Sequence, residues 1–204
     1  MPQPSIEYRE WRHQVRSGLK QLQDSRVQFY EDTELFRVYS STLVPGLLQT
    51  EGYARAVLGI AASVHDLPAD DSEAAARARV ERSRIIHEQG HRFVLVIEES
   101  VLYCRVADTD AMVAQLGYLL TAGALPAVSL GIIPMAARRT HWTEETFHIY
   151  DDRTVSVELV TAEVNVTQPG ELAQYLKRFE RLRGMAVYGA EARALILKAI
   201  EALH

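Results

Sequence analysis

A nearly unbroken apolar run in the middle of the chain limits the folds open to it. Residues Arg92–Glu99 read RFVLVIEE, and an apolar run without alternation is typical of a strand covered on both faces. A second apolar run, Ala127–Ile133, ends at Pro134, and the segment between them, Asp108–Ala122, has helical spacing of its apolar residues. We therefore expect buried central strands with helices packed on them.

Shorter strand and helix signals surround this centre. Strands are predicted at 34–39, 146–150, 154–160 and 162–166, and helices at 51–60, at 71–89, from Pro169 onward and after Gly189. The last three strands are joined by short links, which fit antiparallel pairing. With 204 residues, 48% of them hydrophobic, the chain is long enough for one domain with a substantial core. The expected fold class is α+β: a single domain with helices packed around an antiparallel or mixed sheet.

The N-terminal segment has the pattern of one amphipathic helix. Over Ser5–Phe29 the apolar residues Trp11, Val15, Leu19 and Leu22 recur at spacings of three and four. We therefore divide the chain into an N-terminal helical segment, 1–30, and a main body, 31–204.

The loop STLVPGLLQT, between the predicted strand at 34–39 and the helix at 51–60, is apolar but irregular. Pro45 and Gly46 interrupt any regular element, and Leu43, Val44 and Leu47 are unusual in a connection that should lie at the surface. Such a segment must pack into the core or line a pocket. We predict that it closes over a cavity able to hold a ligand.

Composition excludes several classes of function. The net charge of -5 has the wrong sign for binding nucleic acid by neutralising phosphates, so we expect no direct nucleic-acid binding by this chain. The single cysteine, Cys104, cannot form an intramolecular disulfide, which is typical of a cytoplasmic protein. The sequence contains neither a signal-peptide pattern nor an apolar stretch of about 20 residues, so no membrane association is expected.

The string His87-Glu88-Gln89-Gly90-His91 fits the H-E-x-x-H pattern, which on a continuous helix places two histidines around zinc. Gly90 is a helix terminator, and the strand that starts at Arg92 follows directly, so the two histidines should not share a helix. We expect neither a metal nor a cofactor, since the sequence also lacks both glycine-rich nucleotide-binding patterns.

Carboxylates near the ends of predicted strands are the candidate acid–base groups. Glu98 and Glu99 end one strand, Glu158 lies in another, and Glu163 begins the next. If two of them converged, mutual repulsion would raise a pKa and allow acid–base catalysis. The segment HWTEETFHIY adds His148, which either faces a ligand or lies beside the aromatic face of a hairpin.

A family resemblance rests on several strings. The run LVPGLLQTEGYARAV (Leu43–Val57) is similar to the signature of an actinobacterial domain of unknown function that follows an Xre-type helix-turn-helix in antitoxin-like transcriptional regulators. The resemblance continues with Arg79 and Arg82, in FVLVIEESVL (Phe93–Leu102), in MVAQLGYLLTAGALPAVSLGIIP (Met112–Pro134), and in several C-terminal residues. It implies a sensing or interaction domain within a regulatory protein.

This chain departs from the family pattern in two ways. Ser83 stands where the family usually has a glutamine, and the helix-turn-helix is missing, because only one helix is predicted before the strand at 34–39. The chain is then either a fragment of a longer regulator or a free-standing copy, and the start MPQPSIEY slightly favours the latter.

Three functions follow as hypotheses. The first is a domain that binds a small hydrophobic molecule or a small partner protein, with a site lined by Gln49, Tyr53, Glu99, Tyr103, Trp142 and His148. The second is an enzyme of specialised metabolism that acts on a hydrophobic metabolite, with Glu99, Glu158 and His148 as acid–base residues. The third is a domain that forms a homodimer.

Overall fold

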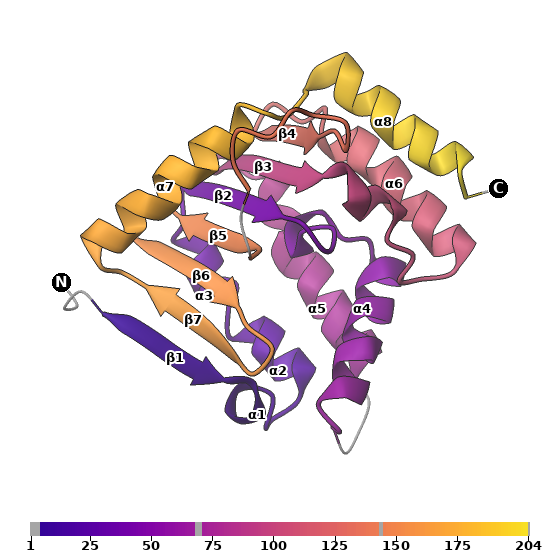
Figure 1. Cartoon of the computed structure of the whole chain (residues 1–204). Coiled ribbons are helices and arrows are strands. Elements are labelled where there is room, and N and C mark those ends of the chain that lie inside the picture. Colours follow the sequence, from indigo (N-terminus) through magenta and orange to yellow (C-terminus); the bar gives the residue numbers. More distant parts are fainter. Residues whose placement is uncertain (1–4, 68–70, 143–144, 204) are drawn as a thin grey trace.

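A computed structural model describes residues 5–67, 71–142 and 145–203 (Figure 1). In this part of the chain the strands form one mixed seven-stranded sheet in the order β1-β7-β6-β5-β2-β3-β4. Helices pack on both faces of the sheet. The predicted α+β class is confirmed, with the sheet mixed rather than wholly antiparallel.

One half of the sheet is parallel and is built from the apolar runs. The strands β2 (Leu35–Ser40), β3 (Arg92–Glu98) and β4 (Val128–Ile133) pair in parallel in that order. Parallel neighbours need crossover connections. These are supplied by α4 (Glu51–Val64) and α5 (Ser72–Arg82) between β2 and β3, and by α6 (Thr109–Ala122) between β3 and β4.

The other half is antiparallel. The strands β5 (Phe147–Tyr150), β6 (Thr154–Glu158) and β7 (Ala162–Val166) form the predicted meander, and β5 joins it to β2. The edge strand β1 (Ile6–Glu10) pairs antiparallel with β7.

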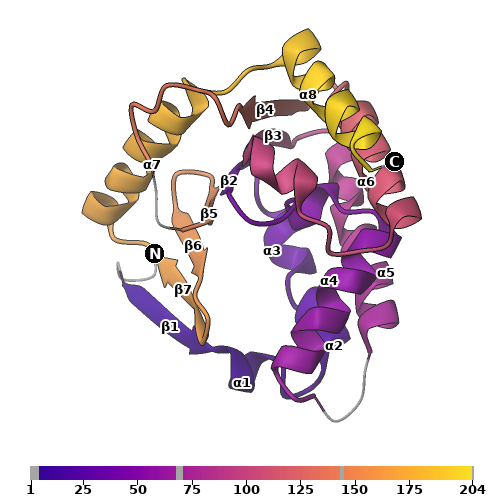
Figure 2. The ribbon, with the colours of Figure 1, turned by 45° about the vertical axis from the view of Figure 1, so that its right-hand side comes forward.

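The two faces of the sheet have separate cores. On one face Phe36, Phe93 and Leu95 pack with α6 and with α8 (Gly189–Glu201). On the other face Phe147 and neighbouring strand residues pack against Phe179 of α7 (Pro169–Arg183). Figure 2 shows α7 on one side of the sheet and α8, α6, α5 and α4 on the other.

The prediction of one continuous N-terminal helix over 5–29 is wrong. The segment begins with β1 and continues as three short helices, α1 (Trp11–Gln14), α2 (Leu19–Asp24) and α3 (Val27–Glu31). Gly18 breaks the run: its φ is +98°, and a Cβ there would lie 2.7 Å from Oδ2 of Asp71. That carboxylate instead accepts hydrogen bonds from the first amides of α2, Leu19 N at 3.1 Å and Lys20 N at 2.9 Å.

The helix predicted at 71–89 is shorter than expected. It ends at Arg82 and is followed by a 3-10 helix, η2 (Ser83–His87), and by Gly90 with a φ of +95°. His87 and His91 therefore do not share a helix, and Nδ1 of His91 lies 2.7 Å from the carbonyl oxygen of Thr33. Two further 3-10 helices, η1 (Gly46–Leu48) and η3 (Glu99–Tyr103), follow β2 and β3.

Candidate functional site

A cavity of about 410 Å³ lies between the antiparallel half of the sheet and the helices α2, α4 and α5, around the predicted apolar loop. Figure 2 shows the elements that surround it. Its apolar walls come from four places: the short N-terminal helices, the loop at 42–46, the cavity-facing side of α4, and the turn between β6 and β7. The apolar lining residues are Trp11, Val15, Leu19, Leu22, Leu43, Val44, Pro45, Val57, Leu58, Ile60, Ala61, Val64, Leu159 and Val160.

Hydrogen bonds hold the loop over the cavity. Nε2 of Gln49 donates to the carbonyl of Val44 at 2.7 Å, and the amide of Val44 donates to the Tyr53 hydroxyl at 3.3 Å. Ser83 Oγ donates to the carbonyl of Gly46 at 3.2 Å. These bonds satisfy backbone groups that an irregular buried loop would otherwise leave unpaired.

A second buried amide, Gln115 of α6, supports the end of the same loop. Its Nε2 donates to the carbonyl of Leu48 at 2.6 Å, and its Oε1 accepts from the amide of Thr50 at 2.8 Å. Leu47 and Leu48 themselves are buried in the core. Residues 43–46 line the cavity, 47 and 48 are buried in the core, and Val44, which is 1% exposed, belongs to both.

The sheet presents a polar floor to the cavity region. His148 lies opposite Ser156 in the β5–β6 pairing, and Glu158 lies opposite Glu163 in the β6–β7 pairing. Nδ1 of His148 is 3.1 Å from the Tyr150 hydroxyl, and Ser156 Oγ donates to Oε1 of Glu163 at 2.8 Å. Burial, and next the charge of Arg26, lower the pKa of His148 to about 4, so the imidazole is neutral at pH 7.

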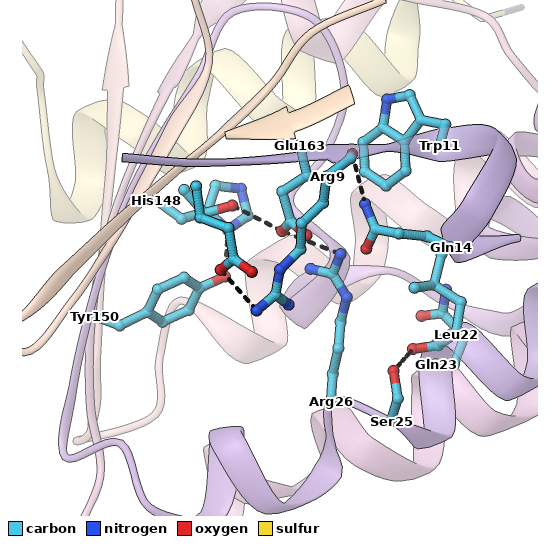
Figure 3. Close-up of polar contacts among 12 residues, drawn as sticks. Arg9, Trp11, Gln14, Leu22, Gln23, Ser25, Arg26, His148, Tyr150 and Glu163 are labelled. Carbon is cyan, nitrogen blue, oxygen red and sulfur yellow. Dashed lines mark hydrogen bonds and ion pairs between the residues drawn. The ribbon is translucent and has the colours of Figure 1, made fainter. Parts of the chain in front are cut away.

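Three arginines face this floor. Arg26, between α2 and α3, forms an ion pair with Glu163 at 3.1 Å, which Figure 3 shows beside His148 and Tyr150. Burial is the largest single influence on Arg26 and lowers its pKa, but Glu163, Tyr150, Tyr30 and Glu158 together outweigh burial, so the pKa of Arg26 is raised. Arg79 and Arg82 come from α5 and also line the cavity.

Arg79 and Arg82 have neutral partners. Nε of Arg79 donates to Oε1 of Gln23 at 3.1 Å, and its Nη1 donates to Oε1 of Gln49 at 2.8 Å. Nη1 of Arg82 donates to the carbonyl of Gln23 at 3.1 Å, and its guanidinium carbon lies 4.5 Å from the centre of the Tyr30 ring. Within the described residues, neither arginine forms an ion pair with a carboxylate.

The structure brings three of the predicted site residues to this cavity: Gln49, His148 and Glu158 line it. Tyr53 lies in the core behind the loop, where burial raises the pKa of its hydroxyl to about 12. Tyr103 packs against the same core.

The other two predicted site residues are also outside the lining. Glu99 is buried, and its Oε2 accepts a hydrogen bond from the amide of Met135 at 2.7 Å. Trp142 is 73% exposed.

The strand-end carboxylates do not gather in one cluster. Glu98 accepts from the Tyr39 hydroxyl at 2.8 Å and pairs with Arg139 at 2.6 Å. β3, which carries Glu98, and β6, which carries Glu158, are separated by β5 and β2, so three strand spacings of about 4.8 Å keep them roughly 14 Å apart. Glu158 and Glu163 are neighbours, but Glu163 is neutralised by Arg26.

Sequence reasoning missed the arginines as site residues, although α5 contains a usable signal. Arg77 and Arg84 have acidic residues three or four positions away and pair with Glu73 and Glu81. Arg79 and Arg82 have only Ala, Ser, Ile or each other at those spacings. An arginine on the buried side of a helix that has no acidic residue three or four positions away is expected to bind a group outside that helix.

Among the described residues, no group of three or more His, Cys, Asp and Glu side chains is arranged to hold a metal ion. No helix in these ranges is both long enough and apolar enough to cross a membrane.

The fold and the cavity define a mixed α+β domain with an arginine-bearing internal site. The chain belongs to the family described as "Domain of unknown function (DUF5753)", which matches residues 27–198. No curated protein matches the sequence.

Three solved structures are similar to this chain at low sequence identity. NucT from Helicobacter pylori superposes with a TM-score of 0.53 at 9% identity, covering 91% of this chain and 99% of that one. Nuc from Salmonella typhimurium, a phospholipase D family member, has a TM-score of 0.47 at 13% identity, covering 92% and 99%. The archaeal chromatin protein TrmBL2 has a TM-score of 0.44 at 9% identity, covering 92% of this chain and 56% of that one. At such identity a likeness concerns the fold alone.

Proposed function

We propose that this chain is the ligand-binding domain of an antitoxin-like transcriptional regulator and that its cavity holds a small molecule. The regulatory setting follows from the resemblance of the Leu43–Val57 string. The ligand-binding role is supported by the cavity itself, whose volume of about 410 Å³ is within the range of small-molecule sites, roughly 300–1,000 Å³. Such sites combine apolar walls with placed polar groups that orient the ligand, and this cavity has both.

One observation carries the proposal: the apolar loop at 43–46 covers open space instead of packing solid. Gln49 and Tyr53 hold the loop through its backbone, and the side chains of Leu43, Val44 and Pro45 line the cavity, with Val44 also packed on the core. A loop needed only to connect β2 with α4 would not require three apolar side chains on a cavity wall.

The same geometry gives less support to an acid–base enzyme. His148, with a pKa near 4, is a weak base at pH 7, and Glu99 lies outside the cavity. Arg79 and Arg82 bind charge but do not transfer protons at neutral pH. We therefore favour binding over catalysis.

Thermal denaturation with matched ten-carbon probes tests the proposal. We expect at least one of 1-decanol, decanoate and decylamine to raise the melting temperature, because a ligand that binds only the folded state stabilises it. The variant Ala61→Trp fills the cavity from α4 and should abolish the shift, whereas Ser63→Trp, an exposed position on the same helix, should keep it.

The result against the proposal is equally defined. No shift with any probe, or the same shift in Ala61→Trp as in the unmodified chain, would contradict a ligand site in this cavity. If the melting temperature instead rose with protein concentration in the absence of probes, the homodimer hypothesis would gain support.

A further inference from the structure

The charges around the cavity are unevenly matched. Arg79 and Arg82 are one turn apart on α5, so their guanidinium groups reach the cavity side by side. Only Arg26, the third arginine, has a carboxylate partner in the described part of the chain. The other two line the cavity without an ion-pair partner among the described residues.

Arg82 is the more buried of the two, with 7% of its surface exposed. Its Nη1 bonds to a backbone carbonyl and its guanidinium stacks on Tyr30, but its buried Nε has no hydrogen-bond partner in the described residues. Most buried polar atoms in proteins are hydrogen-bonded, so a buried donor without a partner in a cavity wall marks a place for an acceptor.

Arg79 bears the electrostatic cost of this arrangement. Burial, and next the positive charge of Arg82, lower the pKa of Arg79 to about 10. It donates hydrogen bonds to the amide oxygens of Gln23 and Gln49, which orient the guanidinium without neutralising it. Glu158 favours the charged form but forms no ion pair with Arg79, and an anion placed beside the guanidinium would relieve the remaining cost of burying the charge.

The net charge of the site indicates what charge a bound ligand should carry. Arg26, Arg79 and Arg82 contribute three positive charges, and Glu158 and Glu163 two negative ones. Arg9 and Glu7, at the edge of the same floor, form an ion pair and add no net charge, which leaves one positive charge. Neutral His148 adds none. A ligand with a single negative charge would bring the site to neutrality.

We infer that the ligand carries one carboxylate, bound by Arg79 and Arg82, and an apolar body that lies along α4 and the loop at 43–46. This inference rests on the proposed ligand-binding function. Arginine matches a carboxylate well because its N–H donors form a planar fork. The apolar body enters past Ile60, Val64 and Val160, which line the cavity and are 52%, 69% and 92% exposed.

Titration calorimetry with the ten-carbon probes tests the charge preference. We expect decanoate to bind the unmodified chain at least tenfold more tightly than 1-decanol, and decylamine to bind most weakly. Decyl phosphate, which carries nearly two charges at pH 7, should bind no more tightly than decanoate.

Two variants assign the preference to the named residues. Arg79→Met and Arg82→Met should each reduce decanoate affinity to within about threefold of 1-decanol affinity while 1-decanol binding stays within about twofold of its original value. Arg77→Met, an exposed arginine of the same helix, is the control and should leave the preference intact. Circular dichroism checks that each variant is folded.

The outcomes separate this inference from the proposed function. If 1-decanol binds as tightly as decanoate, or if decyl phosphate binds more tightly, the single-carboxylate inference is overturned while the cavity remains a ligand site. If Arg79→Met and Arg82→Met both retain the preference for decanoate, the assignment to these arginines is overturned. If none of the probes binds, the proposed function fails together with this inference.

Discussion

The two halves of the sheet present very different surfaces to the helices on the same face. On the parallel half, Phe36, Phe93, Leu95 and Leu130 are buried under α6 and α8. On the antiparallel half the corresponding positions are polar and face arginines across a cavity; they are His148, Ser156, Glu158 and Glu163 from β5 to β7, with Arg9 from β1.

We therefore expect the parallel half of the sheet to contribute mainly to the stability of the fold, and the antiparallel half mainly to ligand binding. Apolar burial stabilises a fold by about 25 cal/mol per Å², and the parallel half uses its whole face for that purpose. The polar half gives up such burial and holds charged groups beside open space, an arrangement that binding sites commonly show. The following predictions test whether the two halves differ in this way.

The largest effect is expected from the apolar half. Phe93 is fully buried and stacks on Phe36 with ring centres 4.9 Å apart, so Phe93→Ala should lower the free energy of unfolding by about 3–5 kcal/mol. Ser156→Ala, a buried position on the polar half, should cost about 1 kcal/mol because Glu163 keeps its ion pair with Arg26. Urea denaturation measures both, and equal losses would show that the two halves contribute alike.

The next effect is a pH dependence confined to the polar half. The pKa of His148 is about 4 in the folded chain and about 6.5 in the unfolded chain, so between these values the unfolded state binds more protons. Stability is therefore fully present above pH 6.5 and falls as pH drops, by about 2 kcal/mol at pH 5 and about 3 kcal/mol at pH 4. Arg26 and Arg82 near the imidazole act in the same direction, and Glu163 opposes them.

The variant His148→Gln isolates this contribution, since glutamine does not titrate. Urea denaturation at pH 7.5 and pH 5 should show a difference in unfolding free energy that is about 2 kcal/mol smaller in the variant than in the unmodified chain. Parallel pH profiles of the two proteins would mean that the imidazole titrates normally and that the polar half is open to water.

Periodicity predicted most of the fold because burial determines it. The apolar runs at 92–99 and 127–133 became β3 and β4, and the helical pattern between them became α6. The predicted N-terminal helix is wrong because two features of this segment do not depend on the spacing of its apolar residues. Residues 6–10 gain backbone hydrogen bonds from the edge of β7, and Gly18 adopts a conformation that ends any helix there.

The candidate site was only partly predictable, because it depends on which strands become neighbours. His148 reaches the arginines of α5 only because β5 pairs antiparallel with β2, which inserts the meander beside the parallel half. Tyr53 and Glu99 lie in the strings that carry the family resemblance, but neither lines the cavity. Each accepts a hydrogen bond from a backbone amide, Tyr53 from Val44 and Glu99 from Met135. The aromatic ring of Trp142 favours a place in the lining of a ligand site, but the sequence pattern does not indicate that this side chain is 73% exposed.

The last prediction concerns the ion pair between Arg26 and Glu163 in the polar half. Glu163→Gln leaves Arg26 without its carboxylate but keeps an acceptor for Ser156, and the Arg26 side chain is 21% exposed. We therefore expect a loss of about 2 kcal/mol in unfolding free energy, below the 3–5 kcal/mol typical of a fully buried pair.

The matched control for this prediction is Glu7→Gln, on the neighbouring strand β1. Glu7 pairs with Arg9 at 2.8 Å, but both side chains are about half exposed, so its loss should change stability by less than about 1 kcal/mol. Urea denaturation at neutral pH compares the two variants. An equal, small loss in both would mean that water screens the Arg26–Glu163 pair as it does a surface pair, and Arg79 and Arg82 would then have less need of an anionic ligand.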